Sequence, residues 1–432
     1  MPVWCCGVVD ISDKEIRGMK VSVQPAVNDT NVDATQPNSQ RQLAIPISAI
    51  SQNREWNAPL NLCLILDHSG SMKGEPIEMV KQAALGLLDK LQPGDRLSVV
   101  VFAHRAQVIV PNQLVGDAKP IKKQIERLSA EGGTSIDTGL KLGIEELAKG
   151  KKEAISQAFL LTDGENEHGN NENCLKLAQL ATNYNFTLNT LGFGDYWNQD
   201  VLEKIADAGG GTLSYIQKPQ QAVKEFSRLF ERIQAVGLTN AYLLLSLTPK
   251  VRLAELKPIA QVAPDTIELP VQQDSYGRYL VRLGDVMQDV ERVVLINMYI
   301  SQLPEGKQTI ASVQVQYDDP ASDSSGLISE NIPVEVNVMR NYQPQINSLV
   351  QRYILALAKY RQTQLAETKL QQGDRAGAAT MLQTAAKTAL QMGDKGAATV
   401  LQTSATRLQL GQELSEAERK KTRIVSKTIL QD

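Results

Sequence analysis

The fold is decided by the stretch Leu64-Ile65-Leu66-Asp67-His68-Ser69-Gly70-Ser71-Met72. It begins as an apolar run typical of a buried strand and ends in a carboxylate, followed by hydroxyls at alternate positions. A turn at the carboxyl end of a parallel strand can aim Asp67, Ser69 and Ser71 at one point, and open α/β sheets bind ligands at that end. Hard cations prefer such oxygen ligands. The stretch therefore predicts a cation site at the edge of a parallel sheet.

The residues around this stretch alternate short apolar runs with amphipathic helical patterns. The apolar runs cover residues 62–66, 97–102, 159–161, 186–193 and 213–216, and the helical patterns cover residues 77–91, 136–147, 175–184 and 222–233. This alternation predicts a doubly wound, Rossmann-like α/β domain over residues 59–236, with a mostly parallel sheet. Residues 107–110 follow the strand ending at Phe102 so closely that we predict a hairpin, with one antiparallel edge strand.

The segments on both sides of this domain have strand patterns. Residues 19–58 contain alternating bursts at 21–27 and 43–50, and residues 237–340 contain strand patterns at 242–247, 279–283, 293–300, 309–317 and 332–338. Two early strands have too little area to form a core alone. We therefore predict one β-sandwich made from both segments, with the α/β domain inserted between them. Residues 1–18 fit no element and are treated as an N-terminal extension.

The end of the chain is predicted to be helical. Within residues 341–414, Gly373-Asp374 and the following alanines recur at Gly393-Asp394, which predicts stacked antiparallel helices in a helical hairpin region. Residues 415–432 are rich in Lys and Arg and are predicted to be a solvated basic tail. Thr422, Ser426 and Thr428 lie in this tail, where phosphorylation would change the local charge, so a phospho-regulated signalling scaffold is one hypothesis for the function.

Composition and motifs exclude several functional classes. A net charge of -3 gives no broad basic face for nucleic acid, and no apolar run approaches the ~20 residues that cross a bilayer, so we expect no membrane insertion. The four cysteines lack metal-binding spacing and no secretory signal is visible, which favours a cytoplasmic protein. The chain has no Walker A motif, no Gly-x-Ser-x-Gly elbow and no His-Glu-x-x-His helix. We therefore expect a binding protein and not an enzyme.

Two further segments make the cation motif specific. Glu131-Gly132-Gly133-Thr134-Ser135 supplies a hydroxyl on a glycine-rich loop before a helix, and Leu160-Leu161-Thr162-Asp163-Gly164-Glu165 ends another strand in a carboxylate. In this order and spacing, the three loops resemble those of von Willebrand factor A domains and integrin I domains. The later run Leu191-Gly192-Phe193-Gly194, with Gly209-Gly210-Gly211-Thr212 after it, is also similar to that family. The resemblance covers residues 59–236.

The resemblance implies a metal-ion-dependent adhesion site, abbreviated MIDAS. Its ligands would be Asp67, Ser69, Ser71 and Thr134, directly or through water, with Asp163 acting mostly through a bridging water. The expected cation is Mg²⁺, with Ca²⁺ or Mn²⁺ as alternatives, and a Glu or Asp carboxylate of a protein partner would complete its coordination. The implied function is an intracellular adaptor or scaffold. Since many relatives work beside ATPases, an alternative is a partner subunit of a MoxR/chelatase-type AAA+ ATPase.

Several residues are predicted to form a partner-binding rim around this site. His68, His104 and His168 follow predicted strands on one edge of the sheet, which gives the hypothesis of a pH-sensitive or soft-metal secondary site. The alternative is three unrelated surface histidines. Glu165, Tyr196 and Trp197 lie on loops of the same edge. The two aromatic residues are either exposed contact residues for a partner or packed against the following helix.

Overall fold

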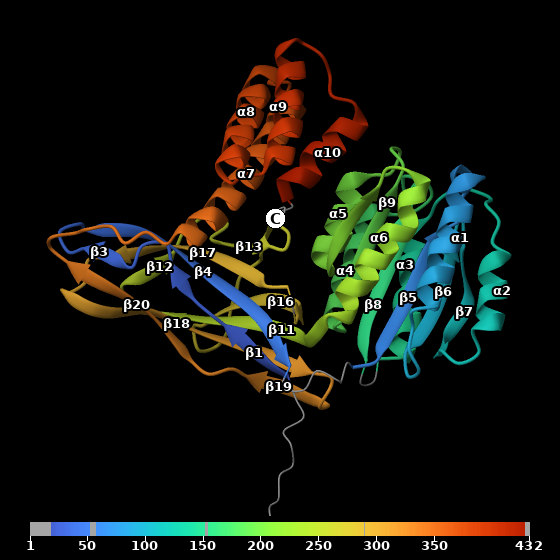
Figure 1. Cartoon of the computed structure of the whole chain (residues 1–432), viewed down its shortest axis with the longest axis horizontal. Helices are drawn as coiled ribbons and strands as arrows, with labels where there is room; N and C mark the ends of the chain where they lie inside the picture. Colours follow the sequence, from blue (N-terminus) through green and yellow to red (C-terminus); the bar gives the residue numbers. More distant parts are fainter. Residues whose placement is uncertain (1–18, 52–57, 152–153, 289, 428–432) are drawn as a thin grey trace, which may run out of the picture.

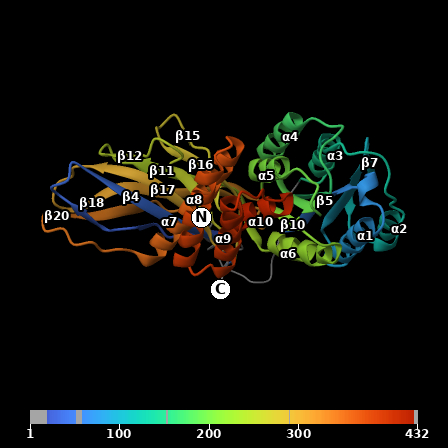
Figure 2. The ribbon, with the colours of Figure 1, turned by 90° about the horizontal axis from the view of Figure 1, so that it is seen from above.

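The computed structural model describes residues 19–51, 58–151, 154–288 and 290–427, and it divides into a β-sandwich, an α/β domain and a helical bundle (Figure 1). The bundle lies over the junction between the other two parts when the molecule is viewed from above (Figure 2). The predicted N-terminal extension, residues 1–18, and the candidate phosphorylation site Thr428 lie outside the described residues. Within the described residues, no helix has the length and apolar character needed to span a membrane.

The α/β domain is built on a six-stranded sheet in the order β10-β9-β8-β5-β6-β7. Its strands are β5 (Leu60–Asp67), β6 (Arg96–Phe102), β7 (Ala106–Leu114), β8 (Ile155–Thr162), β9 (Thr187–Phe193) and β10 (Gly210–Ile216). All neighbouring pairs are parallel except β6 and β7, which are antiparallel, so the prediction of one antiparallel edge strand is confirmed. This order places β5 and its terminal Asp67 near the middle of the sheet, between β8 and β6, so loops from neighbouring strands can surround a site there.

Helices cover both faces of this sheet because the central strand β5 presents apolar side chains to each face. Leu62, Leu64 and Leu66 of β5 pack in one core with α1, α2 and α6, whereas Cys63 and Ile65 pack in a second core with α3, α4 and α5. The helices are α1 (Glu75–Leu88), α2 (Ala118–Glu126), α3 (Ile136–Lys149), α4 (Asn171–Asn183), α5 (Gln199–Ala208) and α6 (Ala222–Gln234). The periodicity missed α2 and α5, the two shortest of the six.

Two seven-stranded sheets form the sandwich within the described residues. One sheet contains β1 (Met19–Val23), β2 (Ala26–Val27), β4 (Asn38–Ser51), β12 (Val251–Leu253), β13 (Ile259–Ala263), β14 (Ile267–Glu268) and β17 (Arg292–Ser301). The other contains β3 (Asn31–Asp33), β11 (Val236–Leu247), β15 (Gln272–Gln273), β16 (Tyr279–Met287), β18 (Gly306–Asp319), β19 (Ser324–Ile328) and β20 (Ile332–Met339). Early strand β4 pairs antiparallel with late strand β17 along its length, so the predicted insertion of the α/β domain into a β-sandwich is confirmed.

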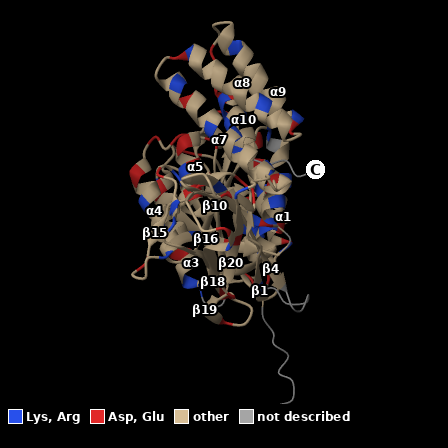
Figure 3. Ribbon diagram, turned by 90° about the vertical axis from the view of Figure 1, so that its left-hand side faces the viewer, with Lys and Arg blue, Asp and Glu red and all other residues tan. Residues whose placement is uncertain are grey.

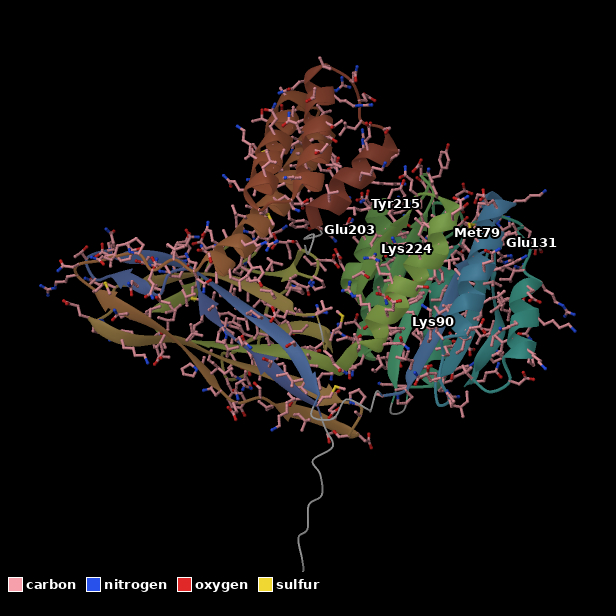
Figure 4. All side chains as sticks on the ribbon, in the orientation of Figure 1. Met79, Lys90, Glu131, Glu203, Tyr215 and Lys224 are labelled. Carbon is pink, nitrogen blue, oxygen red and sulfur yellow. The ribbon has the colours of Figure 1, made fainter. Side chains whose placement is uncertain are left out.

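A cluster of buried polar groups joins the sandwich to the amino end of the α/β sheet. The Asp285 carboxylate on β16 accepts hydrogen bonds from Gln157 Nε2 on β8, at 2.6 Å, and from Thr187 Oγ1 on β9, at 2.7 Å. Arg292 of β17 donates to the Asp285 carbonyl at 2.9 Å. Because Gln157 and Thr187 lie near the starts of their strands, the opposite, carboxyl edge of the sheet faces away from the sandwich. Figure 4 shows Glu131 and Tyr215 toward that edge.

The bundle consists of α7 (Ser348–Gln371), α8 (Arg375–Gln391), α9 (Lys395–Gln409) and α10 (Glu416–Lys427). The repeated Gly-Asp pairs end one helix and begin the next. Gly373 and Gly393 adopt φ of +80° and +84°, and the following Asp374 and Asp394 accept hydrogen bonds from backbone N–H groups three residues later. Alanines dominate the core between these helices, which lets them approach closely. The predicted helix breaks are therefore confirmed.

Helix α10 is packed against the α/β domain, so the prediction of a solvated basic tail is wrong for residues 416–427. Arg423 forms ion pairs with Asp200, Glu203 and Glu367, and Lys427 pairs with Glu203 at 2.6 Å and Asp207 at 2.9 Å. Four of these five pairs are made to α5. Burial alone would lower the pKa of Lys427, but the Asp207 and Glu203 carboxylates outweigh it and raise the pKa.

The same packing removes the predicted phosphorylation sites from the surface. Thr422 is 7% exposed and its hydroxyl lies 2.9 Å from that of Ser404, while Ser426 is fully buried and donates to the Arg423 carbonyl at 2.7 Å. A phosphate on either hydroxyl has no room in this packing. The prediction that these two residues lie on an exposed, phospho-regulated tail is therefore wrong. Figure 3 shows basic and acidic residues interspersed on α10 and the helices beside it.

Candidate metal centre

Three loops meet at the carboxyl edge of the sheet and are tied together by backbone hydrogen bonds. Gly70 N donates to the Gly132 carbonyl at 2.8 Å, and Glu131 N donates to the His68 carbonyl at 2.7 Å. His168 N donates to the Thr134 carbonyl at 3.0 Å. The loops after β5, before α3 and after β8 are thus fixed to one another through the main chain.

The side chains on these loops form a connected set of oxygen atoms. Asp67 is fully buried, and its carboxylate accepts hydrogen bonds from Ser69 N at 2.8 Å and from Thr162 Oγ1. Ser71 Oγ donates to the Asp163 carboxylate at 2.7 Å and lies 3.1 Å from Ser69 Oγ. The structure thus links four of the five predicted ligands, which come from two separate strand ends.

Thr134, the fifth predicted ligand, is located by its distance from Gly164, a glycine of the loop after β8. A Cβ atom on Gly164 would lie 3.2 Å from Thr134 Oγ1 and 4.0 Å from Ser71 Oγ, so both hydroxyls border the same point. Thr134 itself is 3% exposed. The structure therefore brings the third loop to the same site, with a glycine where any side chain would crowd the hydroxyls.

The two carboxylates of this site are held in an environment that disfavours their charge. Burial raises the pKa of Asp67, and hydrogen bonds from Thr162 and Ser69 oppose that rise. Burial also raises the pKa of Asp163 to about 6; the hydrogen bond from Ser71 lowers it, and the nearby Asp67 carboxylate raises it further. Within the described residues, neither carboxylate forms an ion pair with Lys or Arg. The charge that would stabilise both is a cation between them.

The donor set fits a hard divalent cation. Two carboxylates and three hydroxyls offer only oxygen atoms, as Mg²⁺ and Ca²⁺ require. Among the described residues, no three His, Cys, Asp or Glu side chains cluster as metal ligands, so the candidate centre depends on the three hydroxyls. Sequence reasoning missed Thr162, which holds Asp67 in place. The available signal was a hydroxyl residue directly before Asp163, at the end of the neighbouring strand.

The structure separates the three rim histidines into a pair and a single residue. The rings of His104 and His168 have centroids 4.4 Å apart, and both residues are exposed, as is Glu165. His68 is half-buried, and its Nδ1 lies 3.0 Å from the Ser129 carbonyl oxygen. The hypothesis of a secondary site can therefore apply to two of the three histidines, since the ring of His68 has another partner.

Tyr196 and Trp197 are neighbours in sequence but differ in exposure. Tyr196 is 86% exposed on the loop after β9, whereas Trp197 is 2% exposed, so the prediction that Trp197 is an exposed rim residue is wrong. Its ring packs where any side chain on Gly192 would collide with it, and its Nε1 donates to the Gly194 carbonyl at 2.7 Å. Lys420 Nζ of α10 lies over the ring, 4.3 Å from its centroid. Tyr196 alone fits the prediction of an exposed aromatic contact.

The fold and the sequence matches define the chain as a von Willebrand factor type A domain protein. Residues 61–229 match the sequence model of the von Willebrand factor type A domain. A solved structure described as von Willebrand factor type A from Catenulispora acidiphila has the same fold, with a TM-score of 0.81 at 19% identity over 97% of this chain and 99% of that one. The agreement therefore extends beyond the α/β domain to the sandwich and the bundle.

A full-length relative identifies the family more narrowly. The chain is 58% identical to the uncharacterized protein sll0103 of Synechocystis sp. over 413 residues, which is 96% of this chain and 98% of that protein. Residues 348–432 match the Sll0103-like, C-terminal alpha-helical domain. The chain therefore belongs to the same family of von Willebrand factor A proteins as sll0103. It is also 30% identical over 199 residues to inter-alpha-trypsin inhibitor heavy chain H1 of Mesocricetus auratus, but that match spans only 22% of the heavy chain.

Proposed function

We propose that the chain is a binding protein that holds one Mg²⁺ in a MIDAS and uses it to take an acidic side chain of a protein partner. The observation that carries this proposal is the meeting of a buried carboxylate, a half-buried carboxylate and three hydroxyls at the carboxyl edge of the sheet, with no Lys or Arg paired to either carboxylate within the described residues. A von Willebrand factor A domain by itself suggests a protein-interaction or adhesion role.

Each residue of the site has a separate task in this proposal. Ser69, Ser71 and Thr134 provide neutral oxygen ligands, so the five residues supply only two negative charges and the bound Mg²⁺ keeps its affinity for one more carboxylate. Asp67 and Asp163 supply those two charges. Thr162 and the Ser69 amide orient Asp67, and the Ser71 hydroxyl orients Asp163. That the protein acts in the cytoplasm and catalyses no reaction remains a prediction from the sequence.

Affinity capture with the full chain tests this proposal. We expect a partner that binds wild-type protein in Mg²⁺, is released by EDTA, returns when Mg²⁺ is restored, and does not bind the Asp163→Ala variant. Replacing the partner's contacting Glu or Asp with Gln or Asn should abolish binding as well. An AAA+ ATPase among such partners would favour the ATPase-subunit alternative. Partners that bind equally in EDTA, or equally to Asp163→Ala, would contradict the proposal.

A smaller change at Gly164 probes the geometry of the site without removing a ligand. In the Gly164→Ala variant the added methyl lies 3.2 Å from Thr134 Oγ1, so Thr134 must shift by a few tenths of an ångström. We expect the affinity for Mg²⁺, measured by calorimetry, to fall about tenfold, in the range seen when residues that orient metal ligands are changed.

The matched control for this variant is Gly86→Ala in α1. A Cβ atom at Gly86 meets no atom within 4 Å, so this substitution should leave Mg²⁺ affinity unchanged and stabilise the helix slightly. Equal Mg²⁺ affinity in Gly164→Ala and wild-type protein would contradict the expectation that a small shift of Thr134 weakens metal binding.

A further inference from the structure

His104 and His168 come from different parts of the chain and meet beside the glycine loop of the candidate metal centre. His104 follows β6, and His168 follows β8. Their ring centroids are 4.4 Å apart, with an angle of 43° between the ring planes. Within the described residues, no hydrogen bond or ion pair engages a ring nitrogen of either residue, although both are exposed. The ring nitrogens of this pair therefore have no protein partner in the described part of the chain.

The loop below the pair is shaped to admit both rings. Gly132 has a φ of +74°, and a Cβ atom there would lie 2.8 Å from Cδ2 and 3.5 Å from Nε2 of His104. A Cβ atom on Gly133 would lie 2.4 Å from Nε2 of His168 and 2.9 Å from Cε1 of His104. Any side chain at either position would displace a ring. The two glycines thus hold the Nε2 edges of both imidazoles against the same short segment.

The spacing of the rings suits a shared metal ion of a particular geometry. A metal–nitrogen bond of about 2.0–2.1 Å, added to about 1.1 Å from ring centre to nitrogen, places a shared cation about 3.1 Å from each centroid. If one nitrogen of each ring turns toward that cation, centroids 4.4 Å apart give a nitrogen–metal–nitrogen angle of about 90°. A tetrahedral site would need centroids about 5.1 Å apart on the same distances. Right-angled nitrogen ligands are typical of tetragonal Cu²⁺ and Ni²⁺ sites.

We propose that His104 and His168 form a second metal site, for Cu²⁺ or Ni²⁺, separate from the oxygen site. Imidazole nitrogen selects these cations, whereas carboxylate and hydroxyl oxygens select Mg²⁺ or Ca²⁺, so the two sites take different ions. The sites share a border, because Gly133 precedes Thr134 and His168 N donates to the Thr134 carbonyl. The remaining positions on the cation are filled by water or by a partner's side chain. His68 is not a ligand, since its ring contacts Ser129.

The test is Ni²⁺ and Cu²⁺ binding to the full chain in excess Mg²⁺, which keeps the oxygen site occupied. Because thiolates bind the same cations, the measurements use a background with Cys5→Ser and Cys6→Ser. We expect calorimetry to give one Ni²⁺ per chain, with affinity falling at least tenfold in His104→Gln or His168→Gln and at least 100-fold in the double variant. The spectrum of bound Cu²⁺ should show two nitrogen ligands in the starting protein and none in the double variant.

His68→Gln is the matched control, because it removes a third histidine from the same edge without touching the pair. It should leave Ni²⁺ affinity unchanged. Asp67→Ala should also retain Ni²⁺ binding, which separates this site from the proposed Mg²⁺ site, so either proposal can fail alone. Unchanged Ni²⁺ affinity in the His104→Gln, His168→Gln double variant would overturn the inference, as would an equal loss in His68→Gln. Circular dichroism confirms that each variant is folded.

Discussion

Replacing Asp67 with Asn is expected to lower the affinity of the chain for Mg²⁺ by at least about 100-fold, beyond the effect of changing a residue that only orients a ligand. Asp67 is fully buried, and it supplies one of the two negative charges of the site. Asparagine keeps the size of the side chain and an oxygen that can accept from Ser69 N. The loss of Mg²⁺ affinity therefore measures the effect of the negative charge of Asp67 and not a change in the loop's structure. Calorimetry with Mg²⁺ and Mn²⁺ measures it directly.

Thermal unfolding gives a second measurement of the same substitution. Without metal, Asp67→Asn should match or exceed wild type in stability, because a buried charge with no basic partner is removed. With Mg²⁺ at 100 times the wild-type Kd, wild type should gain about 2.7 kcal/mol and the variant at most about 0.4 kcal/mol. Asp285→Asn is the control, since it removes another buried carboxylate at the opposite end of the sheet. Equal stabilisation of Asp67→Asn and wild type by Mg²⁺ would contradict the proposed site.

The sequence predicted what depends on local periodicity and on strand ends. The apolar run before Asp67 could be assigned to a buried strand, and residues at the carboxyl ends of β5 and β8 meet because parallel strands end at one edge. That the early strands join the later sandwich was also predicted, since two strands have too little area for a core of their own, whereas the pairing of β4 with β17 came from the structure. Strands of two or three residues, such as β14 and β15, carry too few side chains for any pattern to be detected.

What the sequence could not give is which polar surface meets which. The basic residues of α10 look solvated in sequence because their partners Glu203 and Asp207 lie more than 200 positions earlier. Residue type alone likewise could not tell which of Tyr196 and Trp197 is exposed. Trp197 is buried because Gly192 leaves room for its ring and Lys420 covers it. These outcomes depend on tertiary contacts that no local rule encodes.

The docked position of α10 bears on the candidate metal centre through Lys420. Its Nζ donates to the carbonyl of Asp195 at 2.5 Å and to that of Trp197 at 2.8 Å, on either side of exposed Tyr196. The segment that presents Tyr196 is therefore held by the last described helix of the chain as well as by its own domain. Contacts of α10 thus help to fix the loop that carries Tyr196.

Replacing Arg423 with Ala is expected to destabilise the contact of α10 with the α/β domain. We expect this loss to exceed the loss from breaking any exposed ion pair. Arg423 Nε lies 2.5 Å from Glu203, whose side chain is only 4% exposed. Taking away one partner of a buried pair leaves the other charged and desolvated, which costs about 3–5 kcal/mol. Lys427 still contacts Glu203 in Arg423→Ala, so we expect about 3 kcal/mol. Hydrogen exchange should show the α10 amides opening about 100-fold more often.

Two comparisons separate this electrostatic account from a general loss of stability. Arg340→Ala breaks an exposed ion pair with Glu305 and should change the stability by less than about 1 kcal/mol, without affecting α10. Replacing both partners, as Arg423→Met with Glu203→Gln, should recover most of the protection, because Glu203 is then no longer a buried charge and Lys427 keeps Asp207 as its partner. If the α10 amides exchanged at the wild-type rate in Arg423→Ala, the ion pairs of Arg423 would not be what holds α10 in place. Packing of α10 against the alanine-rich core of the bundle would then account for its position.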